Sequence, residues 1–269
     1  MTMSEYRVLV ASLLLAALSA CAMRTTTDSG PQAGSAIPSS LPADPEPRAE
    51  PRSRYGNGPI YEVYGRPYRV LQTSYGYQER GVASWYGRKF HGRLTSSQEP
   101  YNMHQLTAAH KSLPLPSYVQ VRNLKNNKTV VVRVNDRGPF VDNRLIDLSY
   151  AAARRLDMVA DGTSLVEVTA ISFDKPPPAT LKQPVTTVDS GSSKVYLQVG
   201  AFGERDNAER RYRLLNGNGF ANAFVSRDER SEPSLYRVRI GPIDDVDQYD
   251  SMLADLKRLG ISDSHIVTE

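Results

Sequence analysis

The sequence predicts two folded domains, a mainly β barrel and then a small α+β domain of ferredoxin-like order. Two stretches rich in Pro, Ser, Thr and Ala, residues 22–54 and 175–193, divide the 269 residues and lack apolar periodicity. Short segments of alternating polarity fill residues 55–174, which is typical of a small β-barrel. Strand and helix patterns then alternate as β-α-β-β-α-β over residues 194–269. We therefore expect 22–54 to be a flexible tether and 175–193 an interdomain linker.

The first twenty residues have the pattern of a secretion signal. Arg7 precedes an apolar run from Val8 to Leu18, which is too short to span a bilayer comfortably and ends in small residues. The ending L-S-A-C resembles a bacterial lipobox, so residues 1–20 are expected to be cleaved and Cys21 to be lipidated, with palmitate among its acyl chains. Ala22 after the cysteine implies the outer membrane by the same resemblance. The alternative is an ordinary signal peptide with an incidental cysteine.

The barrel domain is predicted from strand patterns. Residues 118–123 alternate in polarity, and so do residues 129–135, with Asn126 and Asn127 as a hairpin turn between them. A helix is expected over 149–156 with Ser149 as its N-cap, and a last strand over 165–173.

The second domain is predicted in the same way. Strands are expected at 195–199, 223–225, 235–240 and 265–267, with a helix over 245–258 before the last strand. Asp206 is the expected N-cap of the other helix, because Glu209 three residues later completes a capping-box pattern.

Composition restricts the class of function. The net charge is +4 and the pI about 9.1, without a basic run that carries interleaved aromatics, so we expect no nucleic-acid partner. The single cysteine allows no intramolecular disulfide, and the four histidines lack zinc-ligand spacing. We therefore expect neither a metal nor another cofactor.

Asp136 is the first candidate catalytic residue. It ends the stretch V-V-V-R-V-N-D, and in a regular strand it shares a side with Val130, Val132 and Val134. A carboxyl group on the apolar side is partly desolvated, which suits a proton donor for glycosidic cleavage. The alternative is a structural one, in which Asp136 caps the N-D-R-G turn through an Asx-type hydrogen bond.

Four more side chains could join this site. Glu99 and His110 are plausible second ionisable groups, although a surface acid and a structural histidine are the ordinary alternatives. Trp85 and Tyr86 in G-V-A-S-W-Y-G could stack on sugar faces, and the alternative is that they belong to the core.

Five segments together resemble one bacterial family. G-V-A-S-W-Y-G, F-H-G-R-L-T, L-T-A-A-H-K-S-L-P, V-R-V-N-D-R-G-P-F and R-L-I-D-L-S are similar to the rare lipoprotein A (RlpA) family over residues 61–173. The resemblance implies a double-psi β-barrel and a lytic transglycosylase, a lyase that acts on peptidoglycan glycan strands.

The resemblance also implies roles for individual residues. Asp136, His110 and Glu99 correspond to the active-site groups of the family, with Arg137 and Asn102 as further substrate contacts. Asp136 is expected to protonate the bond between N-acetylmuramic acid and N-acetylglucosamine, after which the muramic 6-hydroxyl attacks C1 of its own sugar. The chain departs from the family pattern at Gln98 and at Asn102, where relatives often carry Gly and Asp; the base cannot be assigned.

The second domain carries its own resemblance. Y-L-Q-V-G-A-F and Y-R-V-R-I-G-P are similar to the paired signatures of SPOR domains, which implies binding to septal glycan without stem peptides. Alternation places Tyr196 and Gln198 opposite Leu197 and Val199. The expected sugar-binding residues of this domain are Tyr196, Gln198, Phe202, Arg237 and Arg239. The alternative is that these residues only form a solvated face.

Three functions follow from these observations. The first is a monomeric lytic transglycosylase, held by its lipid on the periplasmic side of the outer membrane and enriched at the division septum, where its partner is denuded glycan. The second is a non-catalytic lipoprotein that tethers the membrane to that glycan. The third is a hydrolase of the same barrel, which would need a water opposite the acid.

Overall fold

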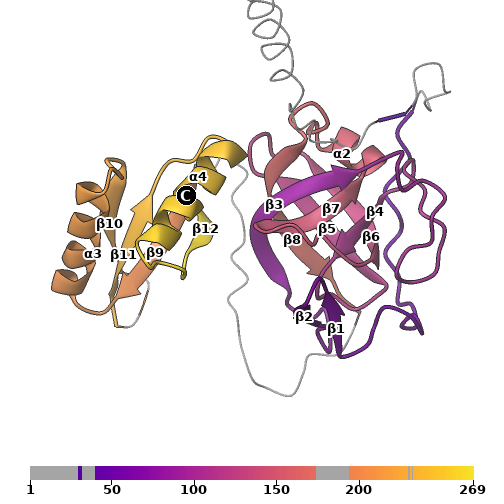
Figure 1. Cartoon of the computed structure of the whole chain (residues 1–269), viewed down its shortest axis with the longest axis horizontal. Coiled ribbons are helices and arrows are strands. Elements are labelled where there is room, and N and C mark those ends of the chain that lie inside the picture. Colours follow the sequence, from indigo (N-terminus) through magenta and orange to yellow (C-terminus); the bar gives the residue numbers. More distant parts are fainter. Residues whose placement is uncertain (1–29, 32–39, 174–193, 230, 232) are drawn as a thin grey trace, which may run out of the picture.

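The chain folds into the two expected domains (Figure 1). The computed structural model describes residues 30–31, 40–173, 194–229, 231 and 233–269. The predicted signal peptide, Cys21 and the linker 175–193 lie outside the described residues. Across the ranges that are described, no helix is long and apolar enough to cross a membrane.

The first domain is a closed barrel of six strands. The strands are β3 (Gln78–Tyr86), β4 (Thr107–His110), β5 (Ser117–Asn123), β6 (Thr129–Asp136), β7 (Arg144–Ser149) and β8 (Thr163–Ile171). Their order around the barrel is β3-β7-β4-β6-β5-β8, with parallel pairs β3–β7 and β4–β6 and antiparallel pairs elsewhere. A hairpin of β1 (Ile60–Val63) and β2 (Arg66–Arg69) precedes the barrel.

The alternation seen in the sequence fills the barrel interior. Val130, Val132 and Val134 of β6 are fully buried in one apolar cluster together with the valines of β5 and β8. The predicted hairpin between β5 and β6 is confirmed, and Asn127 has the positive φ of 58° that asparagine tolerates in a tight turn. Helix α2 (Tyr150–Arg155) begins as predicted, since the Ser149 hydroxyl accepts from the N–H of Ala152.

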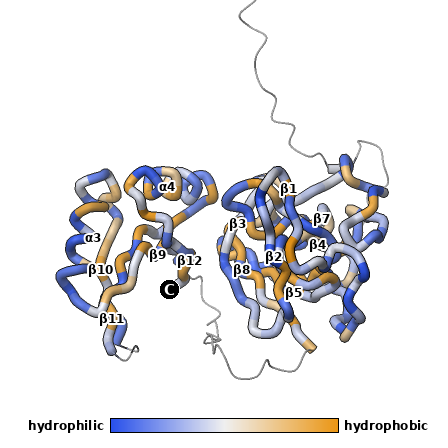
Figure 2. Tube along the Cα trace, turned by 60° about the horizontal axis from the view of Figure 1, so that its bottom comes forward, coloured by the Kyte–Doolittle hydropathy of each residue, from blue (hydrophilic) through white to orange (hydrophobic). Residues whose placement is uncertain are grey.

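The second domain has the predicted β-α-β-β-α-β order. Its elements are β9 (Val195–Phe202), α3 (Arg205–Gly217), β10 (Ala223–Asp228), β11 (Leu235–Ile240), α4 (Val246–Arg258) and β12 (His265–Thr268). The sheet is antiparallel in the order β10-β11-β9-β12. Figure 2 shows that α3 is largely hydrophilic along the chain, so only a narrow face of it is buried.

One helix start differs from the prediction. The N-cap of α3 is Glu204, without a side-chain hydrogen bond, and Asp206 lies inside the first turn. A carboxylate there still interacts favourably with the positive end of the helix dipole. Helix α4 begins one residue after the start of the predicted range 245–258, and Asp245 is its N-cap, which accepts from the N–H of Gln248 at 2.8 Å.

Residues 40–54 lie against the barrel. Asp44 pairs with Arg155 at 2.9 Å, and Glu50 pairs with Arg133 at 2.8 Å. The N–H of Ser53 donates to the carbonyl of Leu115 at 2.9 Å. The flexible tether predicted through residue 54 therefore does not describe residues 40–54. Their polar side chains form ion pairs and hydrogen bonds with specific residues on the barrel surface.

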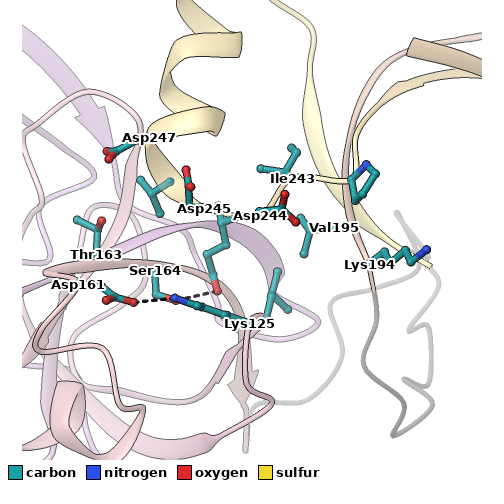
Figure 3. A pocket seen from close by; sticks show the side chains of 14 residues that line it. Lys125, Asp161, Thr163, Ser164, Lys194, Val195, Ile243, Asp244, Asp245 and Asp247 are labelled. Carbon is teal, nitrogen blue, oxygen red and sulfur yellow. Dashed lines mark hydrogen bonds and ion pairs between the residues drawn. The ribbon is translucent and has the colours of Figure 1, made fainter. Parts of the chain in front are cut away.

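The two domains meet where α4 and β12 face β8 and β3 (Figure 1). Arg144 lies 3.5 Å from Asp250 across this contact. Beside it is a cavity of about 500 Å³, on whose wall Lys125 binds Asp161 at 3.0 Å (Figure 3). The contact buries apolar side chains on the outside of the barrel together with side chains of the second domain: Val82, Leu124, Leu165, Val246 and Tyr249.

Candidate active site

A β-bulge redirects Asp136. Ala108 of β4 pairs with Val134, but the next residue, Ala109, pairs with Asp136, so β6 has one extra residue at Asn135. Asp136 therefore lies on the face of Ala109 and not on the side of the buried valines. The regular alternation expected from the sequence is wrong at this position, because the bulge moves the carboxyl group from the barrel interior to its outer face.

The carboxylate of Asp136 is held by three hydrogen bonds. Its Oδ1 accepts from the N–H of Ser96 at 2.8 Å, from the hydroxyl of Ser96 at 2.7 Å and from the N–H of Arg137 at 2.7 Å. Ser96 comes from the loop before β4, so the carboxylate joins that loop to the end of β6. These donors suit an ionised carboxylate. An Asx-type turn would instead use the N–H two residues ahead.

A second carboxyl group, Asp147 of β7, lies in the same row of paired residues across neighbouring strands as Asp136. Ala109 pairs with Asp136 on one side and with Asp147 on the other, and Asp147 pairs in turn with Ser84 of β3. Partners in neighbouring strands point to the same face, so the two carboxyl groups flank the methyl group of Ala109. Their Cα atoms are two strand spacings apart, about 10 Å.

Asp147 differs from Asp136 in its surroundings. Burial raises the pKa of Asp147, the hydroxyl of Ser84 donates to its Oδ1 and opposes the rise, and the negative charge of Asp136 adds to it. The residue keeps partial exposure on the outer face. Asp147 was not predicted from the sequence; the available signal is an acid among the apolar residues of L-I-D-L.

Aromatic side chains form the wall beside this row. Tyr86 stacks on Tyr101 with ring centroids 4.1 Å apart, and both are buried with Met103 and Ala109. Trp85 packs on the barrel core and lies 5.6 Å from the ring of Tyr150. Tyr86 is thus buried behind the site, whereas Trp85 keeps partial exposure, and its stacking on a sugar stays a prediction.

Glu99 lies near Asp136, on the same side of β6. Its Oε2 accepts from Arg133 at 2.7 Å and from the side-chain amide of Asn135 at 2.8 Å. Burial alone would raise the pKa of Glu99, but these two hydrogen bonds hold that pKa below its usual value. Glu99 is therefore an ionised, fixed group that can orient a substrate.

His110 points away from the two aspartates. It pairs with Ile146, whose side chain is in the barrel core, whereas the neighbouring Ala109 faces Asp136 and Asp147. Its Nδ1 accepts from the N–H groups of Ser112 and Leu113, so the ring proton is on Nε2, 2.8 Å from the hydroxyl of Tyr77. Burial lowers its pKa to about 3, which keeps the ring neutral.

Arg137 and Asn102, two of the predicted substrate contacts, form hydrogen bonds within the protein. The guanidinium of Arg137 is almost fully buried and donates to the carbonyls of Gly56, His110 and Leu113 at 2.6–3.0 Å. Asn102 accepts from the N–H of His104 at 3.0 Å in a local turn. The structure thus brings Asp136 and Glu99 together and adds Asp147, while Arg137 supports the site from inside.

The open face of the second domain carries most of its predicted residues. Gln198 bonds His265 at 3.3 Å and Arg239 at 3.4 Å, and Arg237 is fixed by two bonds to Asp228. Leu197, Val199, Val238 and Ile240 are buried on the opposite side, as alternation predicted.

Phe202 lies on the other side of this sheet. The register of β9 against β11 shifts after Gln198, so Gly200 pairs with the buried Val238. The Phe202 ring packs on the apolar core, with the guanidinium of Arg211 5.8 Å from its centre. Phe202 was expected among the sugar-binding residues, and the structure places it on the core side instead.

Comparisons with known proteins agree with this architecture. A family model described as "Lytic transglycolase" matches residues 78–168, and the SPOR domain model matches residues 191–268. The endolytic peptidoglycan transglycosylase RlpA of Vibrio cholerae is 40% identical over 225 residues, which cover 84% of this chain and 82% of that protein. RlpA of Pseudomonas aeruginosa (strain UCBPP-PA14) is 39% identical over 238 residues, 70% of each chain. The solved SPOR domain of Pseudomonas aeruginosa RlpA is 34% identical over 27% of this chain and 96% of its own, with a TM-score of 0.26.

Fold and matches together define a class of protein, a lytic transglycosylase barrel of the double-psi type joined to a C-terminal SPOR domain. Within that class, the chain belongs to the RlpA family of endolytic peptidoglycan transglycosylases. The resemblance stated from the sequence motifs and the fold predicted with it are confirmed.

Proposed function

We propose that this lytic transglycosylase cuts the bond between N-acetylmuramic acid and N-acetylglucosamine in glycan strands without stem peptides, leaving 1,6-anhydromuramic ends at the division septum. The observation that carries the proposal is the row in which Asp136 and Asp147 flank Ala109. Cleavage of a glycosidic bond uses a proton donor and a proton acceptor at one site.

The surroundings of the two carboxyl groups assign their roles. Burial raises the pKa of Asp147, which favours a protonated acid. Asp136 accepts three hydrogen bonds on Oδ1, which suits a carboxylate that acts as the base. Asp147 is then the proton donor and Asp136 the acceptor, which exchanges the role expected for Asp136 from its sequence position.

The reaction balances without water. The Asp147 proton goes to the glycosidic oxygen as the bond from C1 to that oxygen breaks. The muramic 6-hydroxyl forms a new bond to C1, and its proton goes to Asp136. Attack within one sugar gains from proximity. Exchange with solvent afterwards returns Asp136 to the carboxylate and Asp147 to the acid.

The other predicted site residues support this pair. Glu99 is ionised and fixed by Arg133 and Asn135, so it orients hydroxyl or amide groups of the sugar. His110 supports Asp136 indirectly. Its carbonyl accepts from the guanidinium of Arg137, and the backbone N–H of Arg137 donates to the Asp136 carboxylate. We therefore assign His110 a positioning role.

The SPOR domain supplies location. Its open face presents the ring of Tyr196 and the guanidinium of Arg239, groups that stack on sugars and bond their hydroxyls, while the amide of Gln198 is buried and bonds Arg239. Binding of the same denuded strands would raise their effective concentration at the barrel. Lipidation of Cys21 would hold both domains at the outer membrane.

The test uses the mature chain starting after Cys21, incubated with glycan strands freed of stem peptides, with mass spectrometry of the ends. Wild type should give 1,6-anhydromuramic ends and Asp136→Asn none. Reducing muramic ends would indicate a hydrolase instead. Binding of the strands without any new ends would make the protein a glycan tether and overturn the proposal.

A further inference from the structure

Arg133 carries a carboxylate-binding arrangement next to the site. It is three residues before Asp136 on β6, about 10 Å along the strand, on the outer face of the barrel. Its Nε donates to Oε1 of Glu50 at 3.0 Å and its Nη2 to Oε2 at 2.8 Å, so the guanidinium grips that carboxylate with two parallel bonds. This geometry is the one in which arginine recognises a planar carboxylate.

The bound carboxylate comes from outside the barrel. Glu50 lies in residues 40–54, which run along the surface, and the hydroxyl of Tyr118 on β5 also donates to it. The side chains of Arg133 and Glu50 keep 20% and 17% of their exposure. Glu50 therefore fills a shallow site formed by Arg133 and Tyr118 that stays in reach of solvent.

The charges favour a carboxylate in this position. The hydrogen bond from Arg133 is the main cause that lowers the pKa of Glu50, so Glu50 is ionised. Glu99 accepts from the third nitrogen of the Arg133 guanidinium, Nη1, at 2.7 Å, and connects this site to Asn135 beside Asp136. A neutral amide in place of Glu50 would lose the ionic part of both bonds.

Glycan without stem peptides differs from intact glycan at one group. Its muramic acid carries a free lactyl carboxylate at C3, and in intact glycan this carboxyl group is an amide to the peptide. Arg133 lies on the same strand and the same outer face as Asp136, so a muramic acid bound at Asp136 with its lactyl group along β6 would bring that carboxylate to Arg133.

We propose that Arg133 and Tyr118 bind the free lactyl carboxylate of muramic acid, and that Glu50 occupies this site until the substrate displaces it. The proposal rests on the proposed function and names the group by which denuded strands are selected. The exchange replaces one carboxylate by another, so it leaves no unpaired charge at Arg133. A lactyl amide cannot make this exchange.

The experiment compares two substrates that differ only at this group: denuded strands, and the same strands with the lactyl carboxyl converted to a carboxamide. Formation of anhydro ends gives kcat/KM for each. The wild-type chain should prefer the carboxylate by about 10- to 100-fold, the range of one charged hydrogen-bonded contact. Arg133→Gln should bring this ratio close to one.

Glu50→Gln should act in the opposite direction. Removing the competing charge should lower KM for carboxylate strands, leave kcat unchanged and leave carboxamide strands unaffected. The matched control is Glu46→Gln, an exposed residue of the same segment, for which both substrates should behave as in wild type.

Three results would overturn the inference: equal kcat/KM for both strands in the wild type, an unchanged ratio in Arg133→Gln, or a Glu50→Gln variant that matches Glu46→Gln. Absence of anhydro ends from either strand is a different failure, since it contradicts the proposed function. The affinity of Asp136→Asn for the two strands then still decides the inference, with tighter carboxylate binding supporting it and equal binding overturning it.

Discussion

Acidification should remove stability that His110 supplies in its neutral form. The ring is 2% exposed, and its Nδ1 accepts two backbone N–H groups, so a proton on Nδ1 would break both bonds. Burial lowers its pKa from 6.5 to about 3. Between these values the unfolded chain binds the proton and the folded chain does not, so stability is fully present above pH 6.5 and falls as the pH drops toward about 3.

The expected loss follows from the two pKa values. Going from pH 7 to pH 4 protonates the unfolded histidine almost fully and leaves the folded one neutral, which lowers the free energy of unfolding by about 3 kcal/mol. Other groups titrate as well, since Glu50 and Glu99 have lowered pKa values and their ion pairs weaken in acid. A variant without the histidine separates these contributions.

The assay is urea unfolding of wild type and His110→Asn at pH 7, 5.5 and 4. The asparagine oxygen can accept from Ser112 and Leu113 as Nδ1 does, while the contact to Tyr77 is lost, so the variant should start about 1–3 kcal/mol less stable. Its disadvantage should shrink by about 3 kcal/mol at pH 4. A constant difference between the two proteins across this range would refute a buried neutral His110.

Two more predictions concern Arg137 of the barrel and Arg239 of the SPOR domain. Arg137→Met should lower the free energy of unfolding by roughly 2–4 kcal/mol in urea at pH 7, because buried carbonyls of His110 and Leu113 lose their donor; an unchanged midpoint would contradict this. Arg239→Gln should weaken binding of denuded strands about tenfold in a pelleting assay, by the loss of one charged contact, and leave the kcat of the barrel unchanged. A lowered kcat would show that the SPOR face takes part in the reaction.

Local patterns predicted β5, β6 and β8 of the barrel, the element order of the second domain and the cap of α2. The buried valines of β6, the Asn126–Asn127 turn and the cap at Ser149 depend on residues close in sequence, and the structure contains each of them. Alternation failed at Asp136, and Phe202, expected among the sugar-binding residues, lies on the core side of its sheet. In both places a bulge shifts the strand, and a bulge depends on the partner strand, which lies far away in the sequence.

The site itself depends on strand order. Asp147 faces Asp136 only because β7 and β6 both pair with β4, and this order around the barrel has no local signal. Ala109 and His110 point to opposite faces of the barrel because side chains alternate along β4. Residues 40–54 were read as tether from composition, and only the structure shows Glu50 on Arg133.

The central claim is that Asp147 and Asp136 divide the proton transfers. The most direct measurement is the rate of Asp147→Asn on natural strands and on a muramic acid derivative with an activated aryl leaving group. An aryl oxide departs without a proton, so a missing acid matters only for natural strands.

Asp147→Asn should be about 10²- to 10⁴-fold slower on natural strands and should keep most of its rate on the aryl substrate. Asp136→Asn should be slow on both, since the 6-hydroxyl then lacks its base. Equal losses of Asp147→Asn on the two substrates, or a wild-type rate on natural strands, would contradict the claim.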